Sequence, residues 1–197
     1  MESAAQKKIA LRERMRARLA SQSPAEARAK SAAIWERLSV VREFSGARRL
    51  LSYVSTGAEV DTHGLIRQLL AMGRHVCVPR FDEAQRTYVV SEIGDFDGDL
   101  MTGKFGILEP RPEAMRPAVL DPIGIALVPG LAFDETGNRL GRGLGHFDRL
   151  LRQTGGVKIA LAFDFQLLDE VPAETHDMRM DFIVTETRVV NLKGNRK

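Results

Sequence analysis

The stretch GNRLGRGLGHFDR, from Gly137 to Arg149, holds four glycines and three arginines within thirteen residues. It follows the apolar run IGIALVPG and leads into Phe147, Leu150 and Leu151, whose spacing is helical. Glycines allow backbone N–H groups to approach an anion closely, and arginine side chains pair with phosphate oxygens. The stretch therefore predicts an anion-binding loop beyond the carboxyl end of a strand. Composition alone also allows a flexible turn with solvated arginines.

The spacing of the loop glycines does not identify the ligand. Residues 141–145 follow the pattern GxGxG, whereas a P-loop requires GxxxxGK[ST] and a dinucleotide-binding turn requires GxGxxG. The loop is thus an anion site of neither common type.

A second cluster of positive charge lies near the N-terminus. Lys8, Arg12 and Arg16 recur every fourth residue, which places them on one helix face within reach of a common phosphate chain. The apolar residues of this helix form a separate stripe: Leu11, Met15 and Leu19. The basic stripe predicts phosphate binding, with a solvated helix face as the alternative.

The hydrophobic pattern predicts the scaffold that positions these residues. A second N-terminal helix is expected to begin at Ser23, with Glu26 completing a capping box, and a later helix over residues 65–70 ends at Gly73. Six short runs predict strands: RLLSYV, HVCVP, TYVVSEI, IGIALVPG, VKIALAF and DFIVTE. The second run is expected to end at Pro79. Several runs are apolar throughout, which is typical of strands buried on both faces of a parallel sheet.

We therefore expect one three-layer α/β domain over residues 1–197, with a mostly parallel central sheet, helices on both faces and an N-terminal helix pair. Residues 81–118 are rich in glycine, proline and charge, and we expect an irregular excursion with one hairpin there.

Composition limits the remaining function classes. Residues 1–42 carry ten Lys and Arg against four Glu, a bias that suits nucleic acid, a membrane surface or a phosphorylated small molecule. Cys77 is the only cysteine, so no intramolecular disulfide is possible. The chain has no apolar run of membrane-spanning length and no signal-peptide core. We expect a cytoplasmic location.

Several motifs in register resemble the 5-formyltetrahydrofolate cyclo-ligase (5,10-methenyltetrahydrofolate synthetase) family. The stretch PGLAFDETGNRLGRGLGHFDRLL is similar to the signature of that family. Other segments resemble family segments in the same order: the N-terminal K…LR…R helix, EVDT (59–62), VPR (78–80), FGILEP (105–110) and VPAETHDMRMDFIVTE (171–186). The likeness covers nearly the whole chain.

The resemblance implies an enzyme that converts 5-formyltetrahydrofolate to 5,10-methenyltetrahydrofolate and releases ADP and phosphate from ATP. The formyl group is an amide, and its oxygen is a poor leaving group. Transfer of the γ-phosphoryl group to this oxygen activates it, the N10 amine closes the ring, and phosphate departs. The implied partners are the two small molecules, with Mg²⁺ as cofactor. Neither nucleic acid nor a membrane is expected, and the chain is expected to be a monomer.

The resemblance also implies the roles of individual residues. The ATP-binding residues would be Lys8, Arg12, Arg139, Leu140, Gly141, Arg142, Gly143, Leu144, Gly145, His146 and Phe147. Those on the folate side would be Val54, Glu59, Arg142, Gly143, Leu144, Gly145 and His146. Arg142 and Lys8 would be catalytic, and Asp148 and Asp177 would hold Mg²⁺.

The chain departs from the family at His146 and Phe147, where the family usually has two tyrosines. Phosphates near His146 are expected to raise its pKa above about 6.5, although packing beside Phe147 without a functional role is the alternative. This departure keeps open a divergent relative that binds nucleotide but lacks folate chemistry. The basic N-terminal helix pair keeps open a module that docks on RNA.

Overall fold

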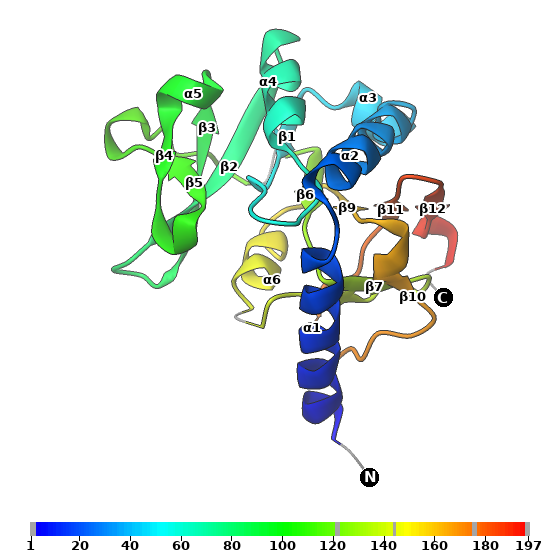
Figure 1. Ribbon diagram of the computed structural model, residues 1–197. Helices are drawn as coiled ribbons and strands as arrows, with labels where there is room; N and C mark the ends of the chain where they lie inside the picture. Colours follow the sequence, from blue (N-terminus) through cyan, green and yellow to red (C-terminus); the bar gives the residue numbers. More distant parts are fainter. Residues whose placement is uncertain (1–2, 121–122, 144, 175–176, 196–197) are drawn as a thin grey trace.

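The computed structural model describes residues 3–120, 123–143, 145–174 and 177–195. Its centre is a seven-stranded sheet in the order β12-β11-β9-β6-β1-β2-β3 (Figure 1). The inner pairs are parallel, and the edge pairs β2–β3 and β11–β12 are antiparallel. The strands are β1 (Arg49–Leu51), β2 (His75–Asp82), β3 (Thr87–Ile93), β6 (Ile125–Val128), β9 (Val157–Leu161), β11 (Phe182–Val184) and β12 (Val189–Asn191).

Six α-helices surround this sheet within the described part of the chain. They are α1 (Ala4–Ala20), α2 (Pro24–Ser39), α3 (Arg42–Gly46), α4 (His63–Ala71), α5 (Phe96–Asp99) and α6 (His146–Leu151). The Ser23 side chain accepts a hydrogen bond from the backbone N–H of Glu26, which confirms the predicted start of α2. The capping box of α1, formed by Ser3 and Gln6, has no counterpart among the predictions.

The alternation of side chains along the strands separates two hydrophobic layers. Leu50 belongs to a cluster that packs against α1, α2, α3 and α4, whereas the next residue, Leu51, belongs to a second cluster that includes Leu150 and Leu151 of α6. Helices therefore cover both faces, as predicted, with four on one side and the short α6 on the other.

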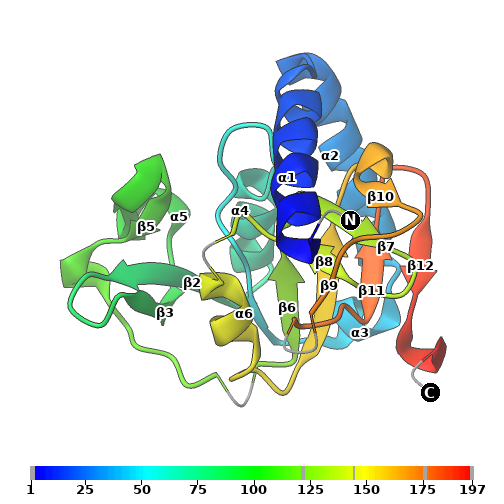
Figure 2. The same ribbon diagram turned by 90° about the horizontal axis from the view of Figure 1, so that it is seen from below.

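Smaller elements complete the fold. A three-stranded sheet contains β10 (Leu167–Leu168), β7 (Ala132–Asp134) and β8 (Arg139–Leu140), and an antiparallel pair contains β4 (Leu100–Thr102) and β5 (Leu108–Pro110). Short 3-10 helices are η1 (Lys104–Gly106), η2 (Pro112–Ala114), η3 (Asp164–Gln166) and η4 (Lys193–Asn195). β2, β3, β4, β5 and α5 form an arm on one side of the molecule (Figures 1 and 2).

Two sequence expectations about this arm were wrong in detail. β2 does not end at Pro79 but continues to Asp82, with Pro79 paired opposite Val90 of β3. β1 pairs with β2 only as far as Cys77, so the later part of β2 has a neighbour on one side alone, where a proline is tolerated. Residues 81–118 contain the predicted strand β3, but the rest of this segment is more regular than expected, because it adds α5 and the β4–β5 pair.

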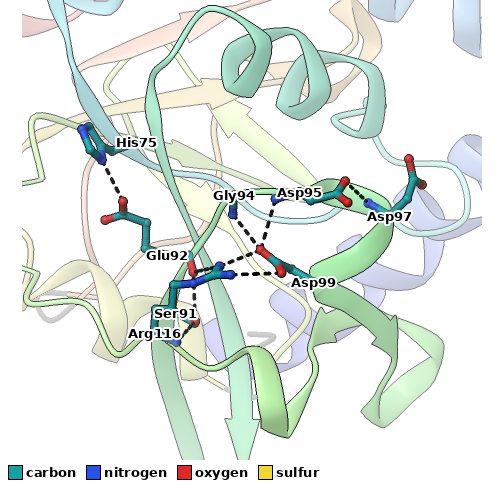
Figure 3. A network of polar contacts seen from close by, with 8 residues as sticks. All are labelled: His75, Ser91, Glu92, Gly94, Asp95, Asp97, Asp99 and Arg116. Atoms are coloured by element: carbon teal, nitrogen blue, oxygen red, sulfur yellow. Dashed lines mark hydrogen bonds and ion pairs between the residues drawn. The ribbon is translucent and has the colours of Figure 1, made fainter.

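A polar network fastens α5 and the segment after β5 to β3 (Figure 3). The Asp99 carboxylate accepts backbone hydrogen bonds from Gly94 and Asp95 and pairs with the Arg116 guanidinium at 2.6 Å. The backbone N–H of Arg116 donates to the Ser91 hydroxyl. The Arg116 contact is the largest cause that lowers the pKa of Asp99, to about 2. The network ties the segments before β4 and after β5 to the main sheet.

Candidate active site

A cavity of about 950 Å³ lies between α1, the arm and the loop that precedes α6. The described residues that the sequence singled out all line it: Lys8, Arg12, Val54, Glu59, Arg139, Leu140, Gly141, Arg142, Gly143, Gly145, His146, Phe147, Asp148 and Asp177. Leu144 lies outside the described residues. Segments from both ends of the chain and from its middle thus meet at one hollow.

The glycine loop adopts backbone conformations in which most residues other than glycine would be strained. Gly143 has φ +110° and Gly145 has φ +64°, both in the left-handed region. A Cβ atom on Gly143 would lie 3.4 Å from Nε of Arg12, so the loop also packs closely against α1. Glycine is required at these two positions by backbone conformation, whereas a Cβ at Gly143 would make only an ordinary van der Waals contact with Arg12.

The basic stripe of α1 lies against this loop. Arg12 Nε donates to the carbonyl of Gly141 at 3.1 Å, and Arg16 donates to the carbonyl of Arg142 at the same distance. The apolar stripe of the same helix is buried, with Leu11, Met15 and Leu19 in the core. A purely solvated basic face is therefore wrong for this helix.

Lys8 is buried, and its ammonium group contacts two carboxylates at the cavity wall. Its Nζ lies 2.9 Å from Glu174 Oε2 and 2.9 Å from Asp177 Oδ2. Burial lowers the pKa of Lys8, but the hydrogen bonds that Lys8 donates to Glu174 and Asp177, with the charges of these acids, outweigh it, so the net pKa is raised. Lys8 therefore stays charged and holds the C-terminal segment against α1.

Arg139 supports the glycine loop through buried hydrogen bonds. Its side chain is buried, with one Nη donating to Asp148 Oδ1 at 2.7 Å and the other to the carbonyl of Pro129 at 3.0 Å. Its Nε is buried without a hydrogen-bond partner among the described residues. Arg139 thus orients Asp148 and the strand end at Pro129 while lining the cavity.

Glu59 and Arg142 pair with each other across the cavity. Arg142 Nη2 lies 2.8 Å from Glu59 Oε1, and Glu59 Oε2 accepts the backbone N–H of Thr56. Burial raises the pKa of Glu59, and the Arg142 charge only partly offsets this rise. Val54, the apolar residue expected beside Glu59, is buried nearby on the same wall.

His146 faces the arm. Its ring lies 5.4 Å from the Phe81 ring and 5.7 Å from the Tyr88 ring, both edge-on, and its Nδ1 is 2.6 Å from Nη2 of Arg149. The pKa of His146 is lowered, by burial first and then by the charges of Arg149 and Arg86. Burial and these two cations thus lower the pKa in the protein without ligand, and the expectation that bound phosphates raise it stays a prediction.

The two carboxylates expected to hold Mg²⁺ line the cavity but do not form a metal cluster. Asp148 is paired with Arg139, and Asp177 with Lys8. Within the described ranges, no group of three or more His, Cys, Asp or Glu side chains is arranged to hold a metal ion. This donor set fits a cation that enters with phosphate oxygens and takes only one or two protein carboxylates.

The lining also includes residues that were not singled out from the sequence, among them Tyr88, Glu109 and Glu174. Tyr88 and Glu109 come from the arm, whose pattern gave no sign that it forms a cavity wall. Glu109 lies inside the FGILEP segment and Glu174 inside the VPAETHDMRMDFIVTE segment, so both stand in motifs that carry the resemblance. Among the described residues, no helix is long and apolar enough to span a membrane.

Comparisons with known proteins find relatives over most of the chain. The model of the 5-formyltetrahydrofolate cyclo-ligase family matches residues 4–186. The 5-formyltetrahydrofolate cyclo-ligase of Mycolicibacterium smegmatis is 35% identical over 145 residues, which cover 72% of this chain and 75% of that protein. The mouse protein of that name is 28% identical over 189 residues, covering 91% and 93%. The NMR structure of Aquifex aeolicus 5,10-methenyltetrahydrofolate synthetase aligns with a TM-score of 0.86 and 28% identity, covering 96% of this chain and 95% of that one.

Proposed function

The chain belongs to the 5-formyltetrahydrofolate cyclo-ligase family, and we propose that the cavity described above is where its two substrates react. The enzyme is a ligase that converts 5-formyltetrahydrofolate to 5,10-methenyltetrahydrofolate at the expense of ATP. It therefore binds a folate and a nucleotide and acts in one-carbon metabolism.

The reaction requires a site that handles phosphate and a flat ring system together. The oxygen of the 5-formyl amide attacks the γ-phosphorus, ADP leaves, and an iminium phosphate forms. The N10 amine then bonds to the activated carbon, its proton is lost, and the C–O bond to phosphate breaks. Phosphoryl transfer depends mainly on positioning and on neutralising charge. The cavity offers basic side chains, among them Lys8 and Arg142, for phosphate, and the buried Glu59 carboxylate with apolar lining residues for the ring system, which suits these two tasks.

In this proposal, the triphosphate lies between α1 and the glycine loop. Lys8 and Arg142 neutralise the transferring phosphoryl group, and Arg12 supports it from α1. The contact between Arg12 and the carbonyl of Gly141 supports the proposal, because it brings the helix cations and the loop to the same place. The remaining ATP-contacting positions are those of the loop from Arg139 to Phe147.

The folate lies toward Val54 and Glu59, with the loop residues from Arg142 to His146 on its other side. Glu59 is suited to accept hydrogen bonds from the amino and ring N–H groups of the pterin. The support is its burial at the cavity wall, where a carboxylate requires donors. Arg142 pairs with Glu59 in the protein without ligand and is proposed to turn to phosphate when ATP binds.

Mg²⁺ is proposed to enter as Mg-ATP and to be held by Asp148 and Asp177. When bound, the ion draws charge from the phosphate oxygens during transfer. Asp148 would be released from Arg139 and Asp177 from Lys8 as these cations turn to phosphate, so the exchange keeps charges paired.

The proposal includes a cytoplasmic monomer that requires neither nucleic acid nor a membrane. Buried Cys77 is the only cysteine, which suits a reducing compartment. The basic helix is engaged with the loop and with the C-terminal segment, so the charge that suggested RNA binding has contacts within the chain. The alternatives of an RNA-binding module and a relative without folate chemistry are not favoured by family membership.

The observation that carries the assignment of the site is the ion pair between Glu59 and Arg142, which joins the two proposed half-sites. The direct experiment incubates the purified protein with 5-formyltetrahydrofolate and Mg-ATP and follows methenyl absorbance near the visible edge. We expect a rise that requires both ATP and Mg²⁺. No rise with fresh substrate, under conditions where ATP binds, would contradict the proposed activity of this site.

A further inference from the structure

Glu109 lines the cavity but has no part in the assignment above. Glu109 lies on β5, and only 3% of the residue is exposed. In the part of the chain that the structure describes, the other acids at the cavity wall each contact a cation: Glu59, Asp148, Glu174 and Asp177. Glu109 forms no such ion pair there. A buried acid at a ligand cavity therefore lacks a charged protein partner.

The two oxygens of Glu109 differ in their surroundings. The carboxylate accepts hydrogen bonds from the backbone N–H groups of Phe81 and Lys104. Oε1 is buried and has no hydrogen-bond partner among the described residues, so the anchored oxygen is Oε2. A Cβ atom on Gly103 would lie 2.5 Å from Oε2, so the absence of a side chain there makes room for it. The anchoring holds the group in place and leaves Oε1 for another donor.

Leaving a buried polar atom such as Oε1 without a hydrogen-bond partner costs free energy. Proteins rarely retain such a group without a partner that is supplied from outside the chain. The guanidinium of Arg80 donates to the carbonyl of Pro110 and so fixes β5 beside β2. Glu109 is thus held in position by backbone contacts on both sides.

The charges near Glu109 come from Arg80 on β2 and from Glu83 in the turn after it. Burial is the largest cause and raises the pKa of Glu109; the charge of Glu83 raises it further, while the two backbone hydrogen bonds and Arg80 lower it. Burial is the largest cause that raises the pKa of Tyr88; the charges of Glu109 and Glu59 raise it further, and Arg142 lowers it. Both acids therefore lie within electrostatic range of one aromatic side chain that lines the cavity.

We propose that Glu109 is a second folate-contacting carboxylate, whose Oε1 accepts a hydrogen bond from an N–H group of the reduced pterin ring. The proposal rests on the proposed function of the cavity. A carboxylate repels the phosphates of ATP, whereas a pterin offers several N–H donors along its edges. The neighbouring lining residues Ile107, Leu108 and Tyr88 suit a flat, partly apolar ring. Glu109 would thus determine which ring system the site accepts.

The test measures binding of 5-formyltetrahydrofolate without ATP, by calorimetry, to the wild type and to Glu109→Gln. The amide keeps the size of the side chain but loses the charge and one acceptor. We expect the folate Kd to rise about 10- to 100-fold, the effect of losing one charge-assisted hydrogen bond. The Kd of Mg-ATP should stay within about twofold of the wild type. Equal losses for both ligands would overturn the proposal in favour of a structural role.

Proton release on binding gives a second readout. A pterin N–H that donates to Glu109 favours its ionised form, so folate binding should release protons at about pH 5.5 and fewer at about pH 7.5. The release is obtained from binding enthalpies in two buffers of different ionisation enthalpy. Because Glu59 is present in both proteins, the difference between wild type and Glu109→Gln reports Glu109 alone. An identical release in both proteins would overturn the proposal.

Two further variants complete the design. Gly103→Ala pushes the carboxyl group without removing it and should weaken folate binding in the same direction. Glu113→Gln changes an exposed acid of the same segment and should behave as wild type. If Glu109→Gln fails to fold, wild-type folate affinity in Gly103→Ala overturns the proposal. Turnover of the wild type is measured separately: absent turnover with intact folate binding contradicts the proposed function and leaves the Glu109 comparison valid.

Discussion

Arg142 and Glu59 stand 83 residues apart in the sequence, yet their side chains form a 2.8 Å ion pair across the cavity. One belongs to the glycine loop and the other to the segment after β1. In the proposed function, each has a different substrate as its partner. Binding of ATP must therefore compete with Glu59 for Arg142, and the released carboxylate then becomes available to the folate. In the proposed function, the ion pair thus links binding of ATP to the availability of the Glu59 carboxylate for the folate.

Arg142→Ala should weaken the use of ATP strongly. Loss of one charge-assisted contact to phosphate is expected to cost roughly 1.5–3 kcal/mol. The pKa of Glu59, which Arg142 now lowers, should rise further, so folate binding should become more sensitive to acid. Steady-state kinetics in ATP and in folate, measured from about pH 5.5 to 8, check both effects. Wild-type ATP kinetics would return Arg142 to the role of a surface cation.

Lys8→Ala should affect both ATP use and folding. Lys8 is buried and holds Glu174 and Asp177 together, so its removal leaves two acids facing each other. Because Glu174 is half-exposed, we expect a modest loss of about 1–2 kcal/mol in the free energy of unfolding. Chemical denaturation measures this loss, and Lys7→Ala, at an exposed neighbouring position, is the matched control. Unchanged stability in Lys8→Ala would mean that the ion pairs do not hold the C-terminal segment.

Glu59→Gln should reduce the affinity for folate more than that for ATP. The amide replaces an acceptor-only group with one that also donates, so one contact to the pterin is lost or reversed. The raised pKa of Glu59 in the wild type also predicts that folate affinity falls as pH drops through it, a dependence that the variant should lack. Binding titrations with folate and with ATP, at pH values above and below the pKa of Glu59, test the prediction. Equal losses for folate and ATP would indicate a structural role.

His146→Tyr should leave the pH dependence of ATP affinity unchanged above about pH 7. The pKa of His146 is lowered, so the ring is neutral in this range and adds no charge that could fade as pH rises. Below about pH 6.5, the reference pKa of histidine, the folded protein resists protonation of this ring, so His146 makes stability fall with pH. Parallel ATP-affinity profiles from pH 7 to 8.5 are expected; a steeper wild-type profile would show that ATP recruits the charged form.

Asp99→Asn should destabilise the arm (Figure 3). The pKa of Asp99 is lowered to about 2, so its stabilising contribution is present above about pH 4 and is lost as pH falls toward 2. Allowing for the exposure of Arg116, we expect a loss of about 1–2 kcal/mol in the free energy of unfolding at neutral pH. Asp97→Asn changes an exposed acid on the same short helix and should have little effect. Equal stability of Asp99→Asn and wild type at pH 7 would contradict this prediction.

The sequence by itself determined the elements and the kind of chemistry. Patterns of a few residues encode the basic and apolar stripes of α1, the cap at Ser23 and the buried strands, because hydrogen bonding and burial in these elements are local or periodic. Gly143 and Gly145 also indicated an unusual backbone, because glycine adopts positive φ angles more easily than other residues. Several motifs that follow one another in the same order as in the family indicated family membership. Pro79 was misread because its effect depends on whether a neighbouring strand is present, which the local sequence does not encode.

Only the tertiary structure decided how these residues are paired. Lys8 pairs with Asp177, which lies 169 residues later in the sequence. The Glu109 carboxylate accepts hydrogen bonds from backbone groups of Phe81 and Lys104 and fits beside Gly103, which has no side chain. The direction of the pKa shift at His146 likewise depends on cations brought to it by folding. Contacts of this kind arise from the crossing of distant segments, and burial sets their strength. Neither the meeting of distant segments nor the burial of their contacts leaves a local or periodic pattern in the sequence.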